Sequence, residues 1–213
     1  MPRIDDYKAA IALAVAELKQ INPKRLQARC GAEYFVEDAR DGLVVPYFGQ
    51  PRRITWPEVS VTPGTGQGEI SLPEQILVLH YLLHASGDPL DGRAIDFREV
   101  PEGGFYWSAF VSRAKNPLLE TFGHDLKLYL KVAVSLGGQP QPLGDAAASF
   151  LAFPRVPITH VLWGDDEEFP SEANILFDAT IPSYFPTEDI AALSGASVYR
   201  LMGAARQFGQ QSA

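Results

Sequence analysis

The sequence predicts a single domain of the α+β class, with helices packed on a mixed or mainly antiparallel sheet. Three observations predict it. Apolar residues recur at three- and four-residue spacing in some segments, as in helices, and alternate with polar residues in others, as in strands. The strand segments do not alternate regularly with the helical ones, so a doubly wound parallel sheet is not expected. The 213 residues, 46% of them hydrophobic, fit one large core.

The chain begins with two predicted helices. Residues 5–21 carry an apolar stripe at helical spacing, and Asn22–Pro23 ends it. Pro23 suits the first turn of a short second helix through Cys30, which Gly31 terminates. Because Cys30 is the only cysteine, an intramolecular disulfide and a multi-thiolate metal site are excluded. We interpret it as a buried residue, since a nucleophilic thiol needs a nearby base that the sequence does not show.

A meander of short strands is predicted from Glu33 to Val61, where apolar and polar residues alternate. Asp41–Gly42 and Phe48–Gly49 supply the residue types expected in its turns. The Gly-rich residues 62–68 follow as a flexible connection. They are not a phosphate-binding loop, because no Gly-Lys-Ser/Thr follows them.

The most clearly marked helix runs from Leu72 to Ala85 and is apolar on nearly all sides, which is typical of a helix at the centre of a fold. Ser71 and Glu74 have the spacing of a capping box, in which each side chain accepts from a backbone N–H of the other residue.

The second half is predicted to mix helices and strands between short turn segments. Strands are expected at 94–97, 149–153, 157–163 and 173–179, and helices at 105–113, 125–136 and 187–206, with a further helical turn from Pro117. Residues 1–4 and 207–213 are expected to be short flexible termini.

Composition argues against several classes of partner. The formal net charge is -8, from 18 basic and 26 acidic residues, so a nucleic-acid backbone would be repelled. Charged residues interrupt the first 20 positions, so no signal peptide is expected, and no apolar stretch is long enough to cross a bilayer. We therefore expect a cytoplasmic protein that binds neither nucleic acid nor a membrane, with a small molecule or another protein as its partner. The oligomeric state is not predicted.

His80 and His84 lie four residues apart on the central helix, so both rings face the same side. Such a pair can share a metal ion. The zinc-protease pattern requires Glu after the first His, but Tyr81 stands there, and a third ligand would have to come from His124, His160 or an acid. We predict no metal site and two hydrogen-bonded histidines, with the pair kept as the metal candidate and His80 as a catalytic candidate.

Acidic residues gather near the C-terminal half. Asp165, Asp166, Glu167 and Glu168 precede Phe169–Pro170, and the run fits either a solvated turn or a site for a hard cation or a docking partner. Asp178 ends an apolar strand, where a carboxylate is costly unless paired. It is interpreted as a cap or a salt bridge to Arg98, Arg113 or Arg155, or alternatively as a perturbed catalytic acid in a cleft.

Gly103 and Gly104 precede three aromatic residues, Phe105, Tyr106 and Trp107, which fit either the edge of a pocket for a flat ligand or a helix start with core aromatics. If a cleft exists, we expect Asp178 and the acidic run to face Tyr106, Trp107, Arg98 and Arg113 there. Binding loops on a rigid scaffold have this mixture of polar, Gly and Pro residues.

Four stretches carry a resemblance: LPEQILVLHYLL, FREVPEGGFYWSAFVSRAKNPL, LWGDDEEFPSEANILFD and YFPTEDI. They resemble the prokaryotic domain-of-unknown-function family 3786, which is met mainly in anaerobes, and the resemblance covers Tyr7 to about Leu201. Some relatives carry an appended iron–sulfur domain with four cysteines that this sequence does not contain, so no cluster chemistry carries over. The resemblance implies an intracellular role near anaerobic redox or cofactor metabolism and supplies no catalytic residue.

Three functions remain open on these grounds. The first is an accessory or small-molecule- or cofactor-binding protein of anaerobic redox or cofactor metabolism, its cofactor unknown. The second is an enzyme that uses carboxylate acid–base chemistry in a cleft. The third is a protein-binding module with an acidic docking face.

Overall fold

The computed structural model describes residues 4–211, and side chains through residue 208. Of the termini predicted to be flexible, 1–4 and 207–213, residues 1–3 and 212–213 lie outside the described residues, whereas Ile4 belongs to a helix that starts there and 207–211 to a helix that ends at Gln211. The predicted α+β class with antiparallel sheets is confirmed. The chain forms two compact units, 1–90 with 151–156 and 183–186, and 91–150 with 157–182 and 187–213. Each unit is made of several separate stretches, since the chain passes between the two units several times. The single domain stays a prediction.

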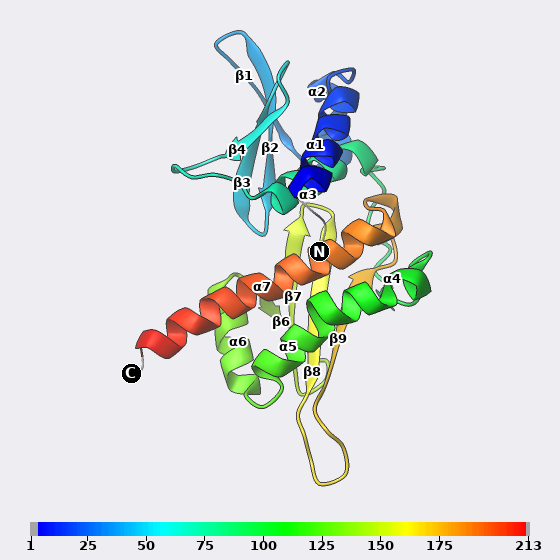
Figure 1. Ribbon diagram of the computed structural model, residues 1–213, viewed down its shortest axis with the longest axis vertical. Helices are drawn as coiled ribbons and strands as arrows, with labels where there is room; N and C mark the ends of the chain where they lie inside the picture. Colours follow the sequence, from blue (N-terminus) through cyan, green and yellow to red (C-terminus); the bar gives the residue numbers. More distant parts are fainter. Residues whose placement is uncertain (1–3, 212–213) are drawn as a thin grey trace. The chain divides into compact units, whose positions relative to one another are not determined.

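The first unit contains a four-stranded antiparallel meander and three helices (Figure 1). The strands, in the order β1-β2-β3-β4, are β1 (Glu33–Glu37), β2 (Arg40–Tyr47), β3 (Gln50–Thr55) and β4 (Ser60–Pro63). The helices are α1 (Ile4–Leu18), α2 (Pro23–Cys30) and α3 (Leu72–His84). The predicted end of α2 is confirmed, because Gly31 caps it in the left-handed conformation that glycine favours.

One predicted turn of the meander is wrong. Asp41 and Gly42 lie inside β2, and the turn is formed by Asp38 and Ala39, both with positive φ, as a two-residue hairpin turn requires. Gly42 is needed for a different reason. A Cβ there would lie 2.0 Å from Cζ of the Phe35 ring across the strand pair.

Helix α3 is buried along most of its length, as its apolar circumference predicts, with Leu79 only 1% exposed. The predicted capping box is not formed. Ser71 makes no side-chain cap hydrogen bond, and Glu74 instead pairs with Arg52 of β3. A charged partner on the neighbouring strand therefore replaces the local backbone contact.

An aromatic cluster fills the core of the first unit around Tyr81. Its ring stacks on Phe153 with centroids 4.4 Å apart and lies 5.8 Å from Phe185. The buried hydroxyl donates to the Cys30 carbonyl at 2.8 Å, which satisfies its polar end.

The second unit is built around the five-stranded antiparallel sheet β5-β9-β8-β7-β6. Its strands are β5 (Ala94–Asp96), β6 (Gln139–Pro140), β7 (Ala146–Phe153), β8 (Val156–Trp163) and β9 (Glu172–Asp178). The end of the β7–β8 hairpin, residues 151–156, counts with the first unit.

In the chain, the helices of the second unit lie between β5 and β6 and after β9. They are α4 (Gly103–Phe110), α5 (Asn116–Phe122), α6 (Leu126–Ser135) and α7 (Thr187–Gln211), with a 3-10 turn η2 (Ile181–Ser183), assigned to both units, before α7. A π-helical segment, η1 (Val111–Lys115), joins α4 to α5 without a break, where the sequence predicted a helix and a separate turn.

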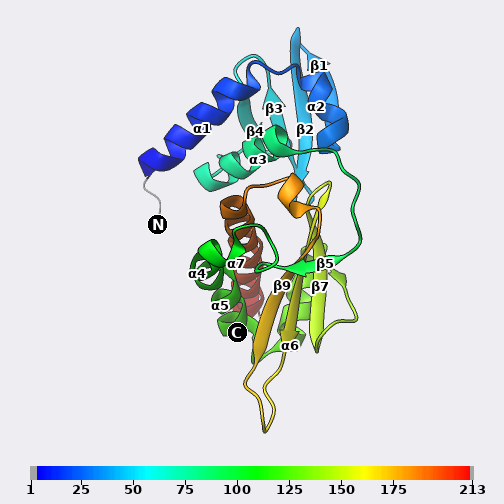
Figure 2. The same cartoon turned by 90° about the vertical axis from the view of Figure 1, so that its right-hand side faces the viewer.

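Helices α4, α5 and α7 lie along one face of the second sheet (Figure 2). His160 of β8 points to that face, since its ring nitrogen Nε2 lies 2.8 Å from the Ser197 hydroxyl of α7. Side chains alternate along a strand, so Thr159 points to the opposite face, together with its cross-strand partner Leu176 of β9. Both are half-buried, so this opposite face is only partly covered.

Candidate functional site

Asp178 occupies the C-terminal end of β9 and is 9% exposed. Its oxygen Oδ1 accepts from the Asp91 N–H at 3.1 Å, the Thr180 N–H at 3.0 Å and the Thr180 hydroxyl at 2.6 Å. Oxygen Oδ2 accepts from the Gly92 N–H at 2.7 Å. The carboxylate thus holds the segment before β5 against the end of β9, and its contacts are backbone and hydroxyl donors rather than the arginines considered from the sequence.

These contacts decide the protonation state of Asp178. Burial alone would raise its pKa, but the bonds from Thr180 and from the Asp91 and Gly92 amides together lower the pKa below its ordinary value. The side chain is therefore an ionised acceptor at neutral pH, and a poor proton donor for general-acid catalysis.

A hollow of about 150 Å³ lies beside Asp178 on the open face of the sheet. Its polar members are Arg93, Thr159 and Asp178. The remaining lining is apolar or glycine: Gly92, Ala94, Leu143, Pro157, Leu176 and Phe177. The segment that carries Leu143 is fixed beside the C-terminal end of β8, because the Asp145 N–H donates to the Leu162 carbonyl and the Asp145 carboxylate accepts from the Gly164 N–H.

Sequence reasoning found Asp178 and missed the rest of this hollow. Leu143, Thr159 and Leu176 are ordinary strand and loop residues, far apart in the chain. Strand alternation is the signal that relates them, since it places Thr159 on the face opposite His160, but it does not reveal which residues of neighbouring strands enclose a space.

The aromatic and arginine candidates lie elsewhere in the second unit and do not line the hollow. The Arg98 guanidinium lies 4.1 Å from the centroid of the Trp107 ring, as in a cation–π contact. Trp107 also packs on the buried core residue Phe110 with centroids 5.5 Å apart. The Trp107 ring therefore packs on the core through Phe110 and also contacts the Arg98 guanidinium.

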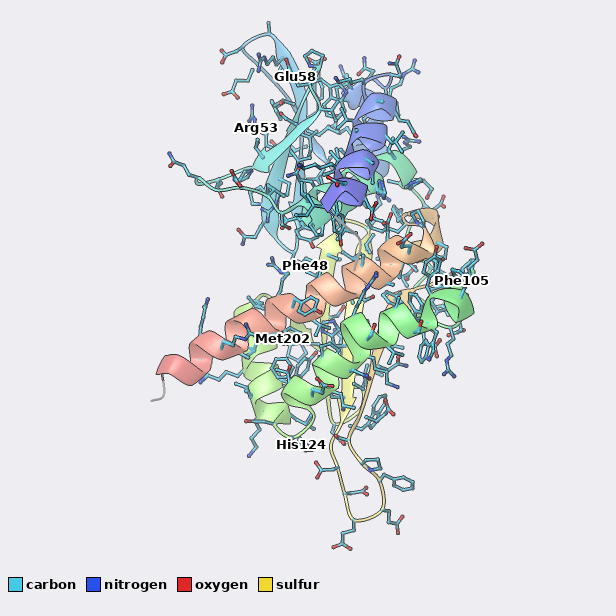
Figure 3. The ribbon with its side chains drawn as sticks, viewed as in Figure 1. Phe48, Arg53, Glu58, Phe105, His124 and Met202 are labelled. Carbon is cyan, nitrogen blue, oxygen red and sulfur yellow. The ribbon has the colours of Figure 1, made fainter. Side chains whose placement is uncertain are left out.

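Tyr106 and Arg113 are also placed away from Asp178. Tyr106 lies edge-on to Phe105 at a centroid distance of 5.0 Å, and Phe105 is 82% exposed (Figure 3). Arg113 belongs to the π-helical segment, whose backbone packs closely on Gly195 of α7. The predicted meeting of these residues with Asp178 is thus not seen in the lining of the hollow.

The acidic run forms the loop between β8 and β9. Its four acids, Asp165, Asp166, Glu167 and Glu168, are exposed, and Phe169 beside them is 66% exposed. Asp166 orders the loop, because its carboxylate accepts from the Glu168 and Phe169 N–H groups at 2.8 and 2.7 Å. Those two bonds lower the pKa of Asp166.

The histidine candidates do not assemble a metal site within the described residues, where no group of three or more potential ligands is found. The rings of His80 and His84 lie 5.8 Å apart in an edge-to-face arrangement. Nδ1 of His124 lies 3.5 Å from Oδ1 of Asp165, and both side chains are mostly exposed.

Two buried titratable side chains, Cys30 and His160, are uncharged at neutral pH. Burial raises the pKa of the Cys30 thiol to about 12, so the thiolate is not formed at neutral pH. Burial lowers the pKa of His160 to about 3, which keeps its ring neutral, and its Nδ1 has no hydrogen-bond partner within the described part of the chain.

A further hollow, in the first unit, has a volume of about 650 Å³ and lies between β4 and the start of α3. It is lined by the glycine-rich connection and its neighbours: Val61, Thr62, Pro63, Gly68, Glu69, Ile70, Ser71, Leu72 and Gln75. It contains none of the residues that the sequence singled out for binding.

The family described as Domain of unknown function (DUF3786) matches residues 22–200. The chain belongs to this family. The DUF3786 match spans both units and includes Asp178, the residues of the hollow beside it and the acidic loop. Neither curated proteins nor solved structures give a significant match. Among the residues described, no helix has the length and apolarity needed to span a membrane.

Proposed function

We propose that this protein binds a small molecule in the hollow beside Asp178. The observation that carries the proposal is a buried, ionised carboxylate at the edge of a space with apolar walls. Binding sites combine apolar walls with a few fixed polar groups in this way. The four hydrogen bonds to Asp178 fix its position before a ligand arrives, which reduces the entropy lost on binding.

Binding is favoured over carboxylate acid–base catalysis. A general acid or base works best when its pKa lies near the working pH, whereas the contacts of Asp178 shift its pKa downward, away from neutrality. His80, the other catalytic candidate, is not among the residues that line the hollow.

The size of the hollow limits the ligand. A cavity of about 150 Å³ accommodates a molecule the size of benzene. The proposed ligand is therefore a small metabolite or one small part of a larger cofactor. The cytoplasm and the anaerobic redox or cofactor metabolism implied by the family resemblance are the cellular setting that we propose for it.

Amide NMR of the protein with a set of small molecules tests the proposal. We expect fragments to shift the amide signals of Ala94, Thr159 and Leu176 in the wild type. Thr159→Leu should abolish those shifts by filling the hollow. Asn174→Leu, on the same face but outside the hollow, should preserve them. If no fragment perturbs these amides in the folded protein, or if Thr159→Leu leaves binding intact, the proposal is wrong.

A second candidate function is docking to a basic protein through the β8–β9 loop. It is favoured by the combination of four exposed acids with Phe169, an aromatic side chain that is 66% exposed on an ordered turn. Aromatic side chains are frequent anchors of interfaces, and surrounding charge selects an oppositely charged partner.

Co-purification from the source cells tests the docking role. A basic partner retained by the wild type and by Phe105→Ser, but lost with Phe169→Ser, would support it, and raised salt should weaken the complex. Equal retention by the two serine variants would overturn it. Phe105 is the matched control because it is also an exposed aromatic residue of the second unit.

A further inference from the structure

The charges around the hollow are mainly negative. Asp178 lines it, and so does Arg93, whose guanidinium lies 3.6 Å from the Asp91 carboxylate and 3.8 Å from that of Glu99. Two carboxylates thus flank the Arg93 guanidinium, and Asp178 adds a third negative charge to the lining, in a chain whose formal net charge is already -8. This field attracts cations and repels anions.

The hydrogen bonds of Asp178 are divided unequally between its two oxygens, which leaves one acceptor position on Oδ2. A carboxylate offers about four acceptor positions, two on each oxygen. Among the described residues, Oδ1 receives three donors, whereas Oδ2 receives one, the Gly92 N–H. A ligand that donates an N–H to Oδ2 fills its second acceptor position, and the bond is strongest when the donor carries a positive charge.

The rest of the hollow is suited to a short hydrocarbon group. Leu143, Pro157 and Leu176 form apolar walls around the half-buried Thr159, and the volume is about 150 Å³. Burial of a few CH₂ or CH₃ groups there contributes about 0.8 kcal/mol each.

We infer that the hollow binds a small organic cation, a primary alkylammonium with a short apolar chain. Its ammonium group donates to Asp178 Oδ2, and its chain lies against Leu176 and Leu143. This inference rests on the proposed small-molecule function and adds the charge and shape of the ligand.

Three probes with the same carbon skeleton test the inference: isobutylammonium, isobutanol and isobutyrate. Affinities are measured by NMR titration of the Thr159 and Leu176 amides. We expect the ammonium to bind about tenfold or more tightly than the alcohol, and the carboxylate to bind weakest. Added salt should reduce the preference for the ammonium.

A pair of lysine variants on β9 tests whether isobutylammonium binds in the hollow. Both variants keep Asp178, whose replacement could disturb the fold. Leu176→Lys places a competing ammonium in the hollow and should abolish binding of isobutylammonium. Asn174→Lys adds the same charge on the same face outside the hollow and should weaken binding much less. Equal losses in the two variants would mean that net charge, and not the hollow, is responsible, and would overturn the inference.

The three probes separate failure of this inference from failure of the proposed function. Binding of the alcohol or the carboxylate as tightly as the ammonium overturns the cationic ligand but keeps a small-molecule site. Absence of binding by all three probes, and by the wider fragment set, overturns both.

Discussion

The Asp178 carboxylate accepts a 2.7 Å hydrogen bond from the backbone N–H of Gly92, 86 residues earlier in the chain. Together with the bond from Asp91, it fixes the segment that leads into β5 against the end of β9. The same carboxylate lines the proposed binding hollow, so one side chain serves both the fold and the candidate site.

Replacing this carboxylate tests its structural role. In Asp178→Asn, one oxygen becomes an NH₂ group that cannot accept from a backbone N–H. We expect a loss of about 1–3 kcal/mol in the free energy of unfolding, measured by urea denaturation. Because the folded pKa of Asp178 is lowered, its contribution is present above the unfolded pKa and is lost as the pH falls through the folded value. The free energy of unfolding of Asp178→Asn should therefore decrease less in acid than that of the wild type. The same pH dependence in both proteins would contradict the structural role of Asp178.

Neighbouring glycines at the start of α4 should respond in opposite ways to alanine. A Cβ on Gly103 would lie 2.1 Å from the Phe97 carbonyl oxygen, so Gly103→Ala should destabilise by about 1–3 kcal/mol. A Cβ on Gly104 meets nothing within 4 Å, so Gly104→Ala should be neutral or stabilising by up to about 1 kcal/mol. Thermal unfolding of the two variants checks this, and similar melting temperatures would count against it.

Removal of a buried side chain from α3 should be costly. Leu79 is 1% exposed, and Leu79→Ala should reduce the free energy of unfolding by about 2–5 kcal/mol, since a cavity is left in a packed core. Leu13, on α1, is 67% exposed and provides the matched control. Leu13→Ala should change stability by less than about 0.5 kcal/mol. A denaturation midpoint that hardly moves for Leu79→Ala would refute the central position of α3.

His160 should make the protein sensitive to mild acid. Burial lowers its pKa to about 3, so between that value and the ordinary pKa near 6.5 the unfolded chain binds the extra proton. Stability therefore decreases as the pH decreases, by about 2 kcal/mol from this residue at about pH 5. Urea midpoints near pH 7.5 and about pH 5 should differ less for His160→Gln than for the wild type. The same pH dependence in both proteins would show that His160 is not the cause.

The protein is expected to purify without tightly bound zinc or an iron–sulfur cluster. It has a single, buried cysteine, and the described residues contain no group of three or more potential ligands. Elemental analysis should give well below one metal ion per chain. A near-stoichiometric metal would contradict this, and its loss in His80→Ala would locate it on α3.

Local patterns were sufficient to predict most of the elements. The apolar circumference of α3, the alternation in β1 to β4 and the Gly31 stop of α2 are signals carried by neighbouring residues, and the structure follows them. The failures come from contacts with neighbouring strands, as with Glu74, which pairs with Arg52 of β3. Asp41–Gly42 has the composition of a turn, but its glycine is required by the Phe35 ring across the strand pair.

The sequence by itself determined the α+β class, the acidic character and the exclusion of thiolate clusters, and it singled out Asp178 as a carboxylate at the end of an apolar strand. Tertiary structure alone decided what Asp178 does. Its donors at Asp91 and Gly92, and the walls at Leu143, Thr159 and Leu176, come from segments far apart in the chain. Hydrogen bonding, desolvation and the shape of a hollow depend on neighbours in space, and no spacing along the chain specifies them.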